Sequence, residues 1–155
     1  RASTENVPGL VGFGKAVEIA QREMGEEGKR LTFLRYKVIE GILGRIDFVR
    51  LNGHRTKRLP NNVNISVEFV EGESMLVSLD LQGVAASSGS ACTSGSVEPS
   101  HVLLALGLSH EDAHGSLRFS LGRENTEEEI ERVLEILPPV VAKLRSVSPL
   151  SRSRA

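Results

Sequence analysis

The chain has 155 residues, of which 39% are hydrophobic and 25% are charged, and it contains no tryptophan. This composition fits one globular domain with an aliphatic core, and the formal net charge of −1 gives no electrostatic reason to expect nucleic acid or an anionic membrane as a partner. No apolar run approaches the roughly 20 residues of a membrane span, the first residues lack the apolar core of a secretion signal, and a single cysteine excludes an internal disulfide, so the sequence predicts a cytoplasmic protein.

Apolar residues at helical spacing predict two consecutive helices in the first part of the chain. The first begins at Pro8 and continues to Met24, and a break is expected at Gly25–Gly28. The second follows from Leu31 to Leu43 and is expected to end near Gly44.

The middle of the chain has the pattern of short strands and turns. Phe48–Leu51 reads as a strand, and the basic run His54–Arg58 is interpreted as a solvated loop rather than a phosphate site. Residues 63–69 alternate between apolar and polar side chains, which predicts a strand with one buried face. Glu73–Leu81 then reads as a short helix, and Val84–Ser87 as a further strand.

The last third predicts two more helices around a strand. A short helix starts at Glu98–Pro99 and ends at Gly107, and Gly115–Gly122 alternates as a strand with Arg118 on its polar face. Thr126 and Glu129 form a capping box for a helix that Pro138–Pro139 is expected to kink or divide, and residues 151–155 are expected to be a disordered tail. Together these elements predict an α/β or α+β domain with a small, mostly antiparallel sheet.

The stretch from Ser87 to Ser96 contains the only cysteine, Cys92, among glycine and hydroxyl residues. A free cysteine is often a small buried hydrophobe, but these neighbours favour a solvent-facing loop, so the sequence predicts a presented thiol. The loop has no Gly-Lys-Ser/Thr ending, and this argues against a phosphate-binding loop. The strand before the loop and the helix after it are expected to act as two fixed anchors.

Four segments in order carry a resemblance to a known family. They are SSGSACTS from Ser87, VEPSHVL from Val97, LRFSLGR from Leu117 and RASTENVPG from Arg1. In these motifs the chain resembles the C-terminal portion of pyridoxal-phosphate cysteine desulfurases, the NifS/IscS-like members of the class V aminotransferases.

The resemblance implies a fold and a division of the chain. It implies the C-terminal part of a fold-type I pyridoxal-phosphate transferase, in which residues 1–25 form an interdomain and dimer-contact segment. Residues 26–150 would be the small domain, with a catalytic loop at 87–97. The cofactor-binding large domain and its lysine attachment site would lie outside this chain, so the isolated chain is expected to be inactive.

The resemblance also implies an activity and its residues. L-cysteine is converted to L-alanine by a homodimer, and the sulfur is carried as a persulfide on Cys92 to an acceptor such as an iron–sulfur scaffold protein. Arg118 is the substrate-binding residue, because a guanidinium fork matches a carboxylate. Thr4 is the cofactor-binding residue, expected to reach the pyridoxal phosphate of the other subunit, although a Ser-Thr pair also suits a plain helix cap.

Other interpretations stay open from the sequence. A selenocysteine lyase or cysteine-sulfinate desulfinase shares the resembled fold, and a non-catalytic sulfur carrier or docking domain would also use Cys92. A metal site is not expected, because His110 and His114 have the spacing of a helical pair but no third ligand is apparent.

Overall fold

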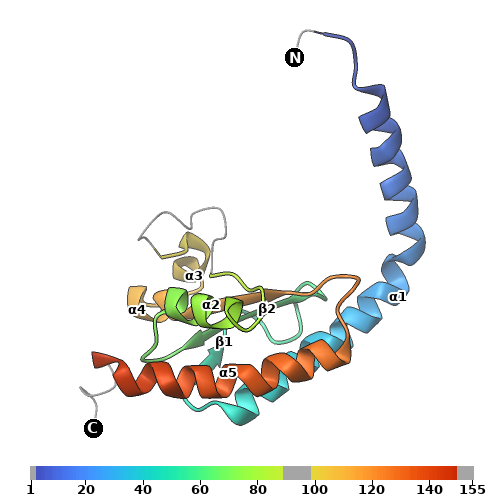
Figure 1. Ribbon diagram of the computed structural model, residues 1–155. Coiled ribbons are helices and arrows are strands. Elements are labelled where there is room, and N and C mark those ends of the chain that lie inside the picture. Colours follow the sequence, from blue (N-terminus) through green and yellow to red (C-terminus); the bar gives the residue numbers. More distant parts are fainter. Residues whose placement is uncertain (1–2, 89–98, 150–155) are drawn as a thin grey trace.

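The computed structural model describes residues 3–88 and 99–149 as helices packed on a small antiparallel sheet (Figure 1). Five helices and three strands occur in these residues: α1 (Val7–Arg45), β1 (Val49–Leu51), β2 (Asn62–Val67), α2 (Gly72–Asp80), α3 (His101–Ala105), α4 (His110–His114), β3 (Ser116–Ser120) and α5 (Glu127–Val147). The second half of α1 and α5 lie side by side, whereas the first half of α1 extends away from the sheet. The α+β class with a small antiparallel sheet is confirmed.

The core lies between one face of the sheet and the helix layer. The strands have the order β1-β2-β3, and both pairings are antiparallel. Leu51, Ile65 and Leu117 stand opposite one another, so their side chains share the apolar face. The largest fully buried side chains join this face to α1, α2 and α5, and they include Leu34, Ile39, Ile42, Ile65, Met75, Leu79, Leu117 and Leu137.

The expected break at Gly25–Gly28 is wrong, because α1 is one continuous helix of 39 residues. A glycine costs about 1 kcal/mol relative to alanine but removes no backbone hydrogen bond. Ion pairs of the helix surface span the same region, with Lys29 bonded to Glu26 at 2.7 Å and Arg30 to Glu27 at 2.9 Å. The helix therefore continues through both glycines, and the expected boundary at residue 25 lies within it.

The expected division of the helix at Pro138–Pro139 does not occur, because α5 continues through both prolines to Val147. Pro138 has no N–H to donate to the carbonyl oxygen of Leu134, four residues earlier. The Arg45 guanidinium of α1 donates to this oxygen at 3.0 Å and so replaces the missing donor. The capping box at the start of α5 is confirmed, with Thr126 and Glu129 bonded in both directions.

The strand expected at residues 63–69 is present as β2, but its polar side chains are not solvated. Asn64 is 9% exposed and Ser66 is 3% exposed, so both faces of the strand are buried. Asn52 covers the polar face and donates to both side chains, at 2.7 Å to Asn64 and 2.9 Å to Ser66. These side chains bond to one another, so the polar residues of the alternating pattern are buried instead of exposed to solvent.

Among the described residues, the segment before the cysteine forms a β-bridge with the sheet at one position. The strand expected over Val84–Ser87 is reduced to one antiparallel bridge between Ser87 and Arg118. After residue 98, the short helix appears as α3, and Gly107 ends its turn with a φ of 84°. Of the expected catalytic loop at 87–97 only Ser87 and Ser88 are described, and the tail at 151–155 lies outside the described residues.

Candidate functional site

A row of four polar residues crosses the sheet on the face opposite the core. The row is Asn52, Asn64, Arg118 and Ser87, and we call it the polar ladder. Asn64 lies on β2 directly opposite Arg118 on β3, and Ser87 lies on the outer side of Arg118. Asn52 continues the register of β1 and donates its backbone N–H to the Asn64 carbonyl oxygen at 2.9 Å.

Arg118 is fixed by Ser87 through both backbone and side chain. The Ser87 N–H donates to the Arg118 carbonyl oxygen at 3.0 Å, and the Arg118 N–H donates to the Ser87 carbonyl oxygen at 2.6 Å. One terminal nitrogen of the Arg118 guanidinium donates to Ser87 Oγ at 3.3 Å. Arg118 is half-buried and turned away from the apolar face, as the alternation of β3 predicted.

The backbone bonds bring the side chains of Asn64 and Arg118 close together. Because the N–H and C=O of Arg118 both point toward Ser87, its pairing with Asn64 is of the non-hydrogen-bonded type. Opposite Cα atoms in such pairs are about 4.5 Å apart, and their side chains are neighbours. Sequence analysis did not single out Asn52 or Asn64, and the only signal for Asn64 was that it is a polar residue in an alternating strand.

Thr4 is exposed in a bend before α1, and Cys92 lies outside the described residues. The N-cap of α1 is Asn6, whose side chain accepts from the Gly9 N–H at 3.2 Å, so the helix-cap interpretation does not apply to Thr4. The N-terminal end of α1 lies far from the sheet, so a single chain does not bring Thr4 to the polar ladder (Figure 1).

Two further basic regions have structural partners. Arg123, three residues after the end of β3, forms an ion pair with Glu23 of α1 at 2.6 Å. In the exposed basic run, Arg55 pairs with Glu40, and Arg58 donates to the Asn52 carbonyl oxygen at 2.7 Å. Burial and the neighbouring Arg35 cation lower the pKa of the Arg58 guanidinium.

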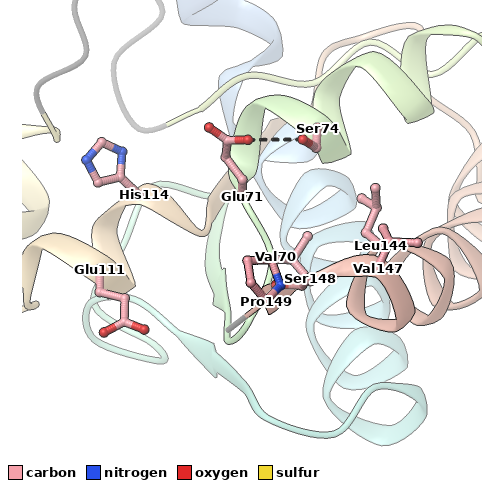
Figure 2. Close-up of a pocket in the computed structure, with 9 residues that line it drawn as sticks. All are labelled: Val70, Glu71, Ser74, Glu111, His114, Leu144, Val147, Ser148 and Pro149. Atoms are coloured by element: carbon pink, nitrogen blue, oxygen red, sulfur yellow. Dashed lines mark hydrogen bonds between the residues drawn. The ribbon is translucent and has the colours of Figure 1, made fainter. Parts of the chain in front are cut away.

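A second surface feature is a groove lined by residues from three helices and the segments next to them (Figure 2). It has a volume of about 480 Å³ between the start of α2, the α4 helix and the end of α5, and its lining residues are Val70, Glu71, Ser74, Glu111, His114, Leu144, Val147, Ser148 and Pro149. The Glu71 carboxylate accepts from the Ser74 hydroxyl at 3.1 Å. The groove is mainly apolar and contains no member of the polar ladder.

Neither a metal cluster nor a membrane-spanning helix occurs in the described part of the chain. No group of three or more His, Cys, Asp or Glu side chains within residues 3–88 and 99–149 could hold a metal ion. No helix formed by those residues is both long enough and apolar enough to cross a bilayer.

Comparisons with known proteins identify relatives along almost the whole chain. Residues 1–133 match the family "Aminotransferase class-V". The chain is 55% identical over 152 residues to "Cysteine desulfurase IscS 1" of Archaeoglobus fulgidus, covering 98% of this chain and 40% of the relative. It is 57% identical over 151 residues to "Cysteine desulfurase IscS" of Methanosarcina thermophila, covering 97% of this chain and 37% of the relative.

The fold has solved counterparts as well. A NifS-like protein from Rickettsia africae superposes with a TM-score of 0.79 at 28% identity, covering 92% of this chain and 36% of that structure. The resemblance to cysteine desulfurases is therefore confirmed, and the chain spans about 40% or less of the length of these relatives.

Proposed function

We propose, from the premise that this chain belongs to the class-V aminotransferase family, that it forms the C-terminal part of a cysteine desulfurase. The complete enzyme converts L-cysteine to L-alanine and passes the sulfur to an acceptor such as an iron–sulfur scaffold protein. The observation that carries the proposal is the pairing of Arg118 with Ser87 at the start of the cysteine-bearing segment. This pairing ties a carboxylate-binding group to the segment that contains the thiol.

Arg118 binds the carboxylate of L-cysteine in this proposal. Its guanidinium fork can donate two parallel hydrogen bonds to a carboxylate, and half-burial strengthens such a charge-assisted pair relative to water. The three hydrogen bonds to Ser87 hold the residue in place before substrate arrives. A preorganised guanidinium loses less conformational entropy on binding than a mobile surface arginine.

Cys92 is the sulfur acceptor in this proposal. The Cβ–S bond of L-cysteine breaks, a bond forms between that sulfur and Cys92 Sγ, and a proton completes the methyl group of alanine. The sulfur is oxidised to the sulfane level while Cβ is reduced, so no external oxidant or reductant is needed. Pyridoxal 5′-phosphate, when bound, supplies the electron sink that this cleavage requires.

The described residues fit the cofactor only in part. The exposed Thr4 hydroxyl is a suitable phosphate donor, and in a homodimer it reaches the cofactor of the other subunit. None of Lys15, Lys29, Lys37, Lys57 and Lys143 follows a histidine, as the cofactor lysine of the resembled family does, so we assign that lysine to a part of the polypeptide outside these 155 residues. The first half of α1 exposes Leu10, 60% accessible, and other apolar side chains, which suits residues 1–25 to a domain or subunit contact.

The test uses the complete cytoplasmic enzyme with its cofactor. Cys92→Ser is expected to lower sulfide release from L-cysteine by more than about 100-fold, because the nucleophile is lost. Arg118→Lys is expected to raise KM about 10- to 100-fold, because the lysine ammonium cannot donate two parallel hydrogen bonds to the carboxylate. Mass spectrometry of the wild-type enzyme after cysteine should show one added sulfur on the peptide that contains Cys92.

Other outcomes would assign the chain differently. Unchanged cysteine turnover in Cys92→Ser would contradict the desulfurase assignment, and preferred turnover of selenocysteine or cysteine sulfinate would indicate the related lyase or desulfinase. Labelling of Cys92 by a persulfide donor without any turnover by the complete protein would indicate a sulfur carrier. The isolated 155 residues are expected to release no sulfide from cysteine.

A further inference from the structure

His54 closes a turn in the loop between β1 and β2 through one ring nitrogen. Its Nδ1 accepts from the Thr56 N–H at 3.1 Å and from the Lys57 N–H at 3.0 Å, and Thr56 Oγ1 lies 3.2 Å from the same atom. A backbone N–H can only donate, so Nδ1 carries no proton in this arrangement. The imidazole is therefore neutral where the turn is closed.

A protonated His54 is incompatible with the closed turn. Both ring nitrogens of an imidazolium are donors, so Nδ1 would face two backbone N–H groups that are donors as well. The His54 side chain is exposed, so a proton reaches it directly from solvent. Histidine is the side chain that ordinarily gains its charge between about pH 8 and pH 5. Acid therefore removes the acceptor that holds the turn at residues 54–57.

The charges around this loop add to the effect. The charged and ionisable groups are Arg55, Lys57 and Arg58 in the loop and Arg35, Tyr36 and Glu40 on the part of α1 that contacts it. The one carboxylate of this set, that of Glu40, is paired with Arg55. An imidazolium at residue 54 would therefore form in a cationic environment, and repulsion favours the opening of the turn.

The closed turn also holds the side chain of Arg58. Gly53 has a φ of 78°, and a Cβ at this position would lie 3.8 Å from Arg58 Nη2, so the guanidinium lies against the turn. The same nitrogen donates to the Asn52 carbonyl oxygen at 2.7 Å. Asn52 in turn bonds to Asn64 within the polar ladder. One arginine therefore connects the turn to the polar ladder.

We propose that His54 is a pH-sensitive switch of the loop between β1 and β2. The neutral imidazole keeps the turn at residues 54–57 closed, and the imidazolium releases the turn together with the hold of Arg58 on Asn52. This inference goes beyond the proposed function, because it assigns a conformational response to a loop that contacts no substrate there. Its effect on substrate binding rests on the proposed function, whereas the opening of the turn does not.

Trypsin cleavage of the complete holoenzyme measures the opening, because the loop contains three cleavage sites, Arg55, Lys57 and Arg58. Cleavage of a locally opened segment follows the population of its open form. The sharpest variant is His54→Asn, since an amide oxygen accepts from backbone N–H groups two or three residues later and gains no proton in this pH range. The ratio of the wild-type cleavage rate to the variant rate at one pH cancels the pH dependence of trypsin. This ratio should lie within about twofold of unity at about pH 8 and rise to about 10-fold at about pH 5.5.

Two further variants separate the switch from a general effect of acid. His110→Asn is the matched control, because His110 is exposed on α4 outside the loop, and its cleavage should equal that of the wild type at both pH values. His54→Ala removes the acceptor at every pH and should be cleaved about 10-fold faster than the wild type at about pH 8. Equal cleavage of the wild type and His54→Asn at about pH 5.5, or no cleavage of either, would overturn the proposal.

The KM for L-cysteine tests the link from the turn to the polar ladder. Between about pH 8 and pH 5.5, KM should rise about threefold more in the wild type than in His54→Asn, because only the wild type loses the hold on Asn52. Titration of the substrate is the same for both enzymes and cancels in this comparison. Cleavage that depends on His54 with an equal change of KM in both enzymes would contradict the link to the polar ladder. If the wild-type holoenzyme does not desulfurate cysteine, the proposed function fails and the cleavage comparison still decides the switch.

Discussion

The two faces of β2 are both buried, but different forces bury them. On one face Val63 and Ile65 are fully buried against the helix layer, and each apolar side chain removed from water contributes about 1.5–3 kcal/mol. On the other face Asn64 and Ser66 are covered by Asn52, and exchanging water for a protein hydrogen bond contributes only about 1 kcal/mol net.

The two faces of the six-residue strand β2 therefore contribute unequally to stability. The apolar face holds the sheet to α1 and α5, so any well-packed aliphatic side chains of the same volume would serve there. The polar face gains less stability from its asparagines, which bond to each other and to Ser66. Burial by itself therefore does not tell which face of β2 contributes more to stability.

The largest loss of stability is expected from a cavity on the apolar face. Ile65→Ala should lower the free energy of unfolding by about 2–5 kcal/mol, because the methyl groups are lost from a site that is 0% exposed. Urea unfolding of the chain followed by circular dichroism measures this change. Leu81→Ala, at a side chain that is 82% exposed, is the control and should change the free energy by less than about 0.5 kcal/mol. Equal losses in both variants would contradict the assignment of the core.

A smaller loss of stability is expected at Gly41 of α1, which faces the Leu134 side chain of α5. A Cβ at Gly41 would lie 2.7 Å from Leu134 Cδ2, so Gly41→Ala should destabilise the chain by about 1–3 kcal/mol through overpacking. Gly44, three residues later on the exposed side of α1, has no heavy atom within 4 Å of such a Cβ. Gly44→Ala should therefore stabilise the chain by about 0.5–1 kcal/mol. Thermal unfolding of the two variants should shift in opposite directions.

The hydrogen bond between Arg45 and Leu134 should be visible as an energetic coupling. Arg45→Met leaves the Leu134 carbonyl oxygen without its donor and should cost about 1–2 kcal/mol. In a Pro138→Ala background the backbone N–H of residue 138 can bond to that oxygen, so the same change should cost about 1 kcal/mol less. Additive losses in this double-mutant cycle would show that Arg45 does not replace the missing donor.

Local signals predicted most of the fold. The capping box at Thr126, the alternation around Arg118 and the turn at Gly107 each depend on residues close in sequence, and all three were confirmed. The donor that replaces the missing N–H of Pro138 comes instead from Arg45, which lies 89 residues before the carbonyl that it contacts. No local pattern carries that information.

The same limit applies to the candidate site. The motif singled out Arg118 as a candidate, and the structure shows the hydrogen bond of its guanidinium to Ser87. The alternating pattern predicted that Asn64 lies on the solvent-exposed face of a strand. Such a pattern shows which residues share a face but not what covers that face. Asn52, the residue that follows β1, covers the Asn64 side chain and bonds to it at 2.7 Å.

Truncation of Ser66, the neighbour of Ile65 on β2, should cost less stability than truncation of Ile65. Ser66→Ala should cost about 1 kcal/mol, because it removes one acceptor from Asn52 but leaves no cavity. Ser66 is 3% exposed and Ile65 is 0% exposed, so the two sites are matched in burial and differ only in chemistry. Urea unfolding of Ser66→Ala and Ile65→Ala under one set of conditions measures the two losses in the free energy of unfolding. A cost at Ser66 as large as that at Ile65 would mean that the polar face also holds the fold together.

The smallest effect is expected on the exposed surface of the helix layer, where Lys37 of α1 bonds to Glu127 at 2.9 Å and Glu131 at 3.1 Å. The hydrogen bond from Lys37 lowers the pKa of the Glu131 carboxyl below its ordinary value. A carboxyl with a lowered folded-state pKa stabilises the fold above its unfolded pKa, and this contribution is lost as the pH falls through the folded pKa. Lys37→Met should therefore flatten the acid side of the stability profile and leave the polar ladder unaffected. Urea midpoints between about pH 3 and pH 6 measure the slope, and an unchanged slope would show that solvent screens the pair completely.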